Sequence, residues 1–133
     1  MAKGYDKHKE RMDAIAALGR PLARRSRSQC ELCETSGVPL AAYEVPPLPD
    51  EPALETTLFL CEPCGREIQS TKILDAARLR VLEKTVWSEL PAAQVVAVRW
   101  VRRLANDGEA WARELLENLY LDEEVEAWAD RER

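Results

Sequence analysis

The sequences CELC at residues 30–33 and CEPC at residues 61–64 contain all four cysteines of the chain. Two residues separate the cysteines within each pair, and 27 residues separate the pairs. A two-residue spacing lets one tight turn direct both sulfur atoms at a single ion, and two such turns complete a tetrahedron of thiolates. The alternatives, two disulfides or four unrelated buried thiols, are less typical of this spacing. We therefore predict one zinc ion held by four ligands, the thiolates of Cys30, Cys33, Cys61 and Cys64.

The predicted ligand set is typical of a structural zinc site rather than a catalytic one. A catalytic zinc keeps one coordination position for water and usually includes histidine or carboxylate ligands. The sole histidine is His8, which lies in a charged, helix-forming segment and is expected at the surface. The sequence also shows no pairing of a nucleophile with a base and no cluster of carboxylates with histidine. We therefore expect a structural zinc ion and no enzymatic activity.

The sequence between the cysteine pairs predicts a β-hairpin. Residues 38–45 have extended character, and residues 55–60 (ETTLFL) form a second candidate strand. Residues 46–52 (PPLPDEP) contain four of the eight prolines and are expected to form the loop. Two strands alone are marginal in water, whereas zinc supplies on the order of 10–16 kcal/mol of folding free energy in small sites. Residues 30–70 are therefore predicted to form a zinc-binding hairpin.

Two zinc architectures are compatible with this hairpin. In a zinc ribbon Cys64 would lie in a turn, whereas in a treble clef it would lie at the N-terminus of a helix. Residues 65–68 (GREI) are able to start such a helix. The sequence leaves both architectures open.

Helix-forming segments flank the hairpin on both sides. Residues 1–29 are predicted to form a basic helical arm, and residues 71–133 a helical bundle. The expected helices cover residues 7–18, 74–89, 91–105 and 111–119, with a short last helix starting after Asp122. The predicted fold class is α+β, mostly α: a zinc-bound β-hairpin, either a zinc ribbon or treble-clef-like, packed with a C-terminal helical bundle.

Large and charged side chains suggest which faces of the C-terminal helices are buried. Helical spacing favours a core position for three tryptophans, Trp87, Trp100 and Trp111. Trp128 is the exception, expected to be partly exposed and to mark a protein-contact patch. Two groups of charged residues are predicted to face solvent: Arg99, Arg102 and Arg103, and the acidic Glu123, Glu124 and Glu126.

Charge is unevenly distributed along the chain and bears on its partners. The net charge is −5, but residues 1–30 carry eight Lys/Arg against three Asp/Glu, so residues 31–133 have a balance of −10. The basic stretch could contact nucleic-acid phosphates through four side chains, Arg20, Arg24, Arg25 and Arg27. The simpler interpretation is a solvated face that neutralises the acidic bundle, because no aromatic residues alternate with the arginines. A protein partner is expected first, and nucleic acid is the alternative.

The sequence predicts no membrane association. No run approaches the roughly 18–20 apolar residues that a membrane span requires. The N-terminal sequence MAKGYDKHKE is polar and lacks the apolar core of a secretory signal. A cytoplasmic location is therefore expected, where paired cysteines more often hold metal than form disulfides.

Several segments resemble one known family. They read CELC at 30–33, AYEVPP at 42–47, LFLCEPC at 58–64, WSELPAAQVVA at 87–97 and WARELLENLYLDEEVEAWA at 111–129. Together they resemble the alkylphosphonate-utilisation operon protein (PhnA-like) family in its longer bacterial form, which begins with a zinc-binding region and continues into helices. That family usually ends in a small β-barrel-like domain, whereas this sequence stops at Arg133. The resemblance implies a zinc-ribbon protein. A phosphonate hydrolase, the label of some members, would need an open metal site that this sequence does not show.

The region from Cys30 to about Ser70 also resembles treble-clef HNH nucleases, in which two CxxC pairs bracket a hairpin. In those enzymes a histidine-rich strand supplies the general base and the catalytic metal ligands. The corresponding residues 42–46 read AYEVP, and Gly65 stands where a histidine often follows the last cysteine. The resemblance therefore implies at most a degenerate nuclease site.

Overall fold

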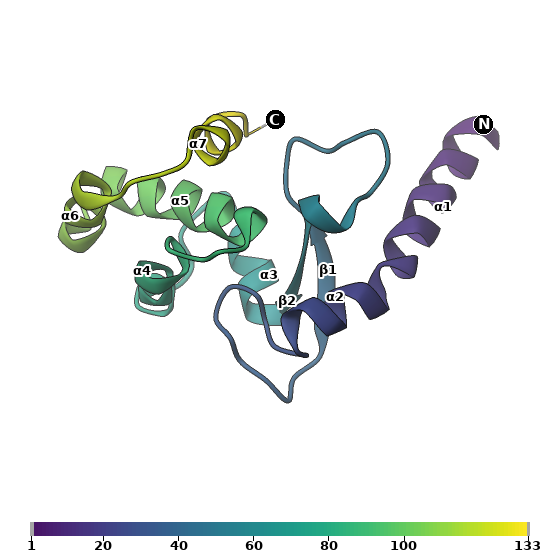
Figure 1. The fold of residues 1–133 in the computed structure, drawn as a ribbon, viewed down its shortest axis with the longest axis horizontal. Coiled ribbons are helices and arrows are strands. Elements are labelled where there is room, and N and C mark those ends of the chain that lie inside the picture. Colours follow the sequence, from purple (N-terminus) through teal and green to yellow (C-terminus); the bar gives the residue numbers. More distant parts are fainter. Residues whose placement is uncertain (1, 133) are drawn as a thin grey trace.

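The hairpin predicted between the cysteine pairs is the only β-sheet in the described part of the chain. The computed structural model describes residues 2–132, with side chains described from residue 6. Strands β1 (Leu40–Glu44) and β2 (Thr57–Cys61) are antiparallel, with Leu40 opposite Cys61 and Glu44 opposite Thr57. Cys61 therefore lies at the open end of the hairpin. The proline-rich loop and the short 3-10 helix η1 (Leu54–Thr56) lie at the closed end (Figure 1).

Two helices precede the hairpin and form the N-terminal arm. Helix α1 (Ala2–Ala17) projects away from the rest of the molecule, whereas α2 (Gly19–Ser26) lies beside the hairpin (Figure 1). Arg11 joins the arm to β1, because its guanidinium donates to both carboxylate oxygens of Glu44, at 2.9 and 2.6 Å. Leu22 of α2 is completely buried. The arm is thus attached by Arg11 on α1, and on α2 by apolar packing and by the ion pair of Arg25 with Glu31.

Helix α5 (Pro91–Asn106) is the centre of the C-terminal half. Pro91 occupies its first turn, where a missing N–H costs nothing, and most of its side chains are buried. Helices α4 (Leu82–Thr85), α6 (Ala110–Asn118) and α7 (Glu123–Asp130) all pack against α5. This arrangement confirms the predicted fold class, a mostly α-helical α+β protein with a hairpin packed against helices.

One predicted helix is wrong. Residues 74–89 form only the 3-10 helix η2 (Arg78–Val81) and the single turn α4. The physical reason is the buried carboxylate of Glu67, which accepts the backbone N–H groups of Leu74 and Asp75 at 2.6 and 3.0 Å. These hydrogen bonds hold the backbone of Leu74 and Asp75 in a loop conformation instead of a regular helix. Leu74, where the predicted helix was expected to begin, is exposed.

The burial predicted for the tryptophans is correct for Trp100 but wrong for Trp87. Trp87 is 50% exposed because it follows the short α4 turn instead of lying on a long helix face. Trp111 is half-buried and packs against the core. Trp128 is also half-buried, and its indole N–H donates to the carbonyl of Pro46 at 3.2 Å. Its polar edge therefore binds the hairpin loop.

The solvent-facing position predicted for Arg99 is also wrong. Its side chain is buried and donates to three backbone carbonyls, those of Trp128 at 2.6 Å, Ala129 at 3.2 Å and Arg131 at 2.7 Å. The last carbonyls of a helix have no partners within the helix, and a guanidinium supplies the donors they require. Arg99 therefore fixes the C-terminus of α7 onto α5.

The hairpin and the helices share one continuous apolar core. Leu32, between the first two cysteines, belongs to the same buried cluster as Leu58, Leu82 and Val98. The hydroxyl of Thr85 on α4 donates to the carbonyl of Leu32 at 2.8 Å, and both residues are buried. None of the helices described over residues 2–132 is long and apolar enough to cross a membrane.

Candidate metal centre

Two backbone turns position the four cysteines. The first turn follows α2: the N–H of Glu34 donates to the carbonyl of Cys30 at 2.8 Å, and that of Cys30 to the carbonyl of Thr35 at 3.0 Å. Glu34 takes a left-handed conformation (φ 66°) to close this turn. The second turn is the start of helix α3 (Glu62–Ile68), where Cys61 is the N-cap and Cys64 lies in the first turn. A helix beginning at the second cysteine pair is the treble-clef-like alternative.

The two turns bring all four sulfur atoms together at the open end of the hairpin. The Sγ atoms of Cys30, Cys33, Cys61 and Cys64 all lie within 4.8 Å of one another. The Sγ atoms of Cys33 and Cys61 are 3.7 Å apart. Cys33 is half-buried and the other three are buried, and all four are free thiols. The group could therefore hold one metal ion, as the spacing of the cysteines predicted.

Hydrogen bonding and burial shift the pKa values of three of the thiols, Cys30, Cys33 and Cys64. A hydrogen bond from Cys64 lowers the pKa of Cys30, and the same bond, together with burial, raises the pKa of Cys64. Burial also raises the pKa of Cys33. Four thiolates cannot coexist in this space without a cation, because each disfavours the ionisation of the others. A divalent metal would supply the compensating charge, so the donor set fits a thiophilic ion such as zinc.

Arg78 completes the surroundings of the sulfur cluster, and the sequence did not predict it. Its Nη2 atom lies 3.4 Å from the Sγ of Cys64, 3.5 Å from that of Cys61 and 3.9 Å from that of Cys33. The hydrogen bond with Cys61 and the charges of the neighbouring cysteines raise the pKa of Arg78, so it stays protonated. Four thiolates with one divalent ion would carry a net charge of −2, and Arg78 would offset part of it. The spacing of residues in the sequence does not identify Arg78 as a neighbour of the thiols, because its position depends on the loop that Glu67 holds in place.

Replacing Arg78 with glutamine should therefore weaken metal retention without abolishing the fold. Loss of a group that contacts metal ligands typically costs 10–100-fold in metal affinity, and we expect about tenfold faster transfer of zinc to a chromogenic chelator. Arg78→Lys should be intermediate, because a lysine restores the charge but not the forked donors. Arg66→Gln is the matched control: Arg66 lies on α3, is largely exposed and pairs with Glu62 instead. Equal transfer rates for Arg78→Gln and Arg66→Gln would contradict the role assigned to Arg78.

The four arginines predicted to contact nucleic acid separate into two groups. Arg25 turns inward, donating to both carboxylate oxygens of Glu31 at 2.9 and 2.8 Å and to the carbonyls of Leu54 and Thr57 at 2.7 and 2.6 Å. It is therefore a structural residue rather than a surface cation. The other three, Arg20, Arg24 and Arg27, are exposed and form no ion pair with any residue between 6 and 132.

Comparisons with family models, curated proteins and solved structures find no match to this chain.

Proposed function

We propose that this protein is a non-enzymatic interaction module, fastened by one structural zinc ion. The observation that carries the proposal is the cluster of four mutually close thiols, three of them buried, which offers sulfur at every ligand position. Such a site has no position for an activated water, so the ion would supply folding energy rather than chemistry. The thiol cluster lies between α2, the hairpin and α3, so a bound ion would join these three elements.

The groove between the hairpin and α3 supports a non-enzymatic role. HNH nucleases take their general base and catalytic metal ligands from the strand that β1 resembles, and here about 590 Å³ of open space lies beside it. Its lining includes Ala42, Tyr43, Gly65 and Gln69, and its only carboxylate among the described residues is Glu62, paired with Arg66. None of the described residues that line it is a histidine. A groove lined mainly by small, aromatic and amide groups supports the proposal of a protein without nuclease activity.

We propose membership of the PhnA-like family on the sequence resemblance alone, and a cytoplasmic location on the four free thiols. The family proposal adds no reaction, because its supporting segments contain cysteines, apolar residues and helix-forming residues but no acid–base pair. The conclusion therefore remains a binding protein whose surfaces are organised by its metal.

Metal analysis joined to activity assays tests this function. We expect one zinc per chain after purification in reducing buffer, and cobalt substitution should give the intense visible bands of a tetrahedral four-sulfur site. The zinc-loaded chain should neither hydrolyse phosphonoacetate nor cleave plasmid DNA in the presence of magnesium or manganese. An activity on either substrate would overturn the proposal if that activity co-purifies with the chain and is lost in a Cys64→Ser variant.

Nucleic-acid binding is a second candidate, favoured by the three exposed arginines of the α2 region. Arg20 and Arg24 are four residues apart on α2, so they share one helix face, and Arg27 follows directly at its C-cap. Fluorescence anisotropy with labelled DNA and RNA should show an affinity that falls steeply with salt and weakens several-fold in Arg24→Gln/Arg27→Gln. Arg102→Gln/Arg103→Gln, which removes two charges from α5, is the control. An affinity that is insensitive to salt would eliminate this candidate.

A further inference from the structure

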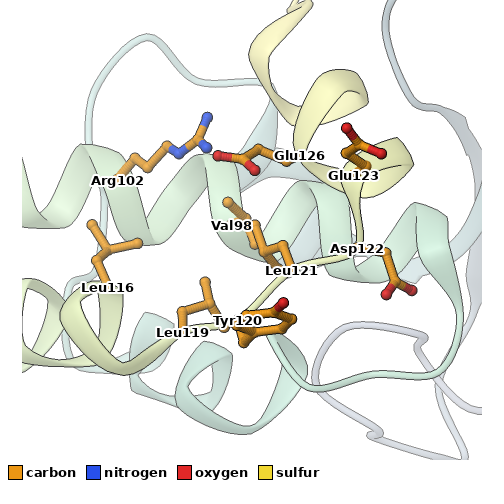
Figure 2. A pocket seen from close by; sticks show the side chains of 9 residues that line it. All are labelled: Val98, Arg102, Leu116, Leu119, Tyr120, Leu121, Asp122, Glu123 and Glu126. Carbon is orange, nitrogen blue, oxygen red and sulfur yellow. The ribbon is translucent and has the colours of Figure 1, made fainter.

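A groove on the C-terminal helices combines an apolar floor with an acidic rim. It encloses about 720 Å³ between α5, α6, α7 and the segment joining the last two helices (Figure 2). Its apolar part consists of Val98 from α5, Leu116 from α6, and Leu119 and Leu121 from the connecting segment. Val98 is fully buried and the leucines are half-buried, so the groove exposes the edge of the main core. At the groove, apolar side chains of the core are therefore partly exposed to solvent.

Tyr120 lies at the lip of this groove. The segment from Leu119 to Asp122 is extended, so successive side chains alternate in direction. Leu119 and Leu121 pack against the core, and Tyr120 between them is 85% exposed, the most exposed of the large hydrophobic residues described. Its side chain contributes nothing to the core. Tyrosine in this setting is typical of residues that contribute most of the energy of a protein contact.

The rim of the groove is acidic, and its carboxylates form no ion pair among the described residues. Asp122, Glu123 and Glu126 line it, and none forms an ion pair with any residue the structure describes. The one cation lining the groove, Arg102, is already paired with Asp130 at 2.7 Å. The N-terminus of α7 accounts for acidic residues in its first turn, but not for a leucine floor beside them. Carboxylates and leucines together define an amphipathic surface.

We infer that this groove binds a cationic segment of a partner protein, one that presents large apolar side chains between lysines or arginines. Charge complementarity selects a basic occupant, because unpaired carboxylates attract cations over several ångströms and disfavour acidic partners. The leucine floor selects an apolar anchor, because burial of its exposed edge yields free energy only when apolar atoms cover it. A small polyamine would satisfy the charges but leave the leucines and Tyr120 in water. This inference names the partner class for the proposed interaction module and rests on that function.

Anisotropy with a defined probe tests the inference on the full, zinc-loaded chain. The probe is a short fluorescein-labelled peptide of lysine and leucine, with the leucines at helical i, i+3, i+4 spacing. We expect saturable binding that weakens about tenfold in Glu123→Gln/Glu126→Gln and by a similar factor in Tyr120→Ser. Glu114→Gln/Glu117→Gln is the matched control, because it removes two exposed charges from α6 outside the groove and should change affinity less than about twofold.

Each alternative occupant gives a different result. Equal weakening by the groove and control variants, or equal binding of a peptide with serine in place of leucine, would show attraction by net charge alone and overturn the inference. No binding of the lysine–leucine peptide would also overturn it, while leaving the zinc module standing, since that is tested by metal content and turnover. Sedimentation that shows concentration-dependent self-association, lost in Glu123→Gln/Glu126→Gln, would assign the groove to a second copy of this chain instead.

Discussion

Replacing Cys64 with serine should abolish stable zinc binding and unfold the hairpin together with the helices that share its core. Serine is a poor ligand for zinc, and Cys64 contributes both a thiolate and a buried core side chain. Zinc binding contributes on the order of 10 kcal/mol to small structural sites, more than the whole stability of many domains. We therefore expect loss of the cooperative thermal transition, rather than a shift of a few degrees.

Tryptophan fluorescence measures how far this unfolding spreads. All four tryptophans lie between residues 87 and 128, outside the hairpin, so their emission reports on the C-terminal half. The shared core and the Thr85–Leu32 hydrogen bond predict that removing zinc from the natural chain with a chelator changes this emission, and that adding zinc restores it. Ser70→Ala, an exchange near α3 that leaves the thiols intact, should behave like the natural chain. An unchanged tryptophan transition in Cys64→Ser would contradict the coupling between hairpin and helices.

Replacing Arg25 with alanine should destabilise the protein by about 3 kcal/mol, the lower end of the usual cost of breaking a buried ion pair by removing one partner, because 21% of the Arg25 side chain is exposed. The change removes four hydrogen bonds and leaves the carboxylate of Glu31, whose side chain is only 6% exposed, without a counter-ion. The carbonyls of Leu54 and Thr57 also lose the hydrogen bonds from Arg25, although that of Leu54 keeps the backbone N–H of Thr57 as a donor. Urea denaturation at neutral pH measures the effect.

Arg24 provides the control for this experiment because it precedes Arg25 and points to solvent. Arg24→Ala should change the free energy of unfolding by less than about 0.5 kcal/mol. Glu31→Gln in the Arg25→Ala background should recover part of the loss, since it removes the uncompensated charge. Similar losses for Arg24→Ala and Arg25→Ala would show that the contacts of Arg25 with Glu31 and the backbone contribute little.

The sequence predicted best what local chemistry determines. The CxxC spacing predicted the four residues whose sulfur atoms cluster at the candidate metal centre, and the proline-rich loop placed both strands within a few residues of their observed limits. Pro91 likewise marked the start of α5. These signals act within one turn or one hairpin, so neighbouring residues suffice to recognise them.

What the sequence could not predict depends on contacts between distant residues. Glu67 converts an apparent helix over 74–89 into a loop by accepting two backbone N–H groups from that loop. Arg78 reaches the thiols only because this loop carries it there. Arg99 has the composition of a solvent-facing helix residue but is buried by the end of α7, some 30 residues later. Each of these polar side chains has its partner in another element, and hydrophobic periodicity does not record such partners.

Glu31 also bears on how the hairpin avoids aggregation. The outer edge of β2 would otherwise present the free N–H and carbonyl of Phe59, a template on which another extended chain could add. Glu31 occupies both groups: its carboxylate accepts the N–H of Phe59 at 2.8 Å, and its own N–H donates to the carbonyl at 2.9 Å. A single residue thus occupies the positions at Phe59 that a third strand would use. Exchange of this glutamate for alanine would free the N–H of Phe59 at the edge, so its effect should be seen in a shorter lag time of fibril formation.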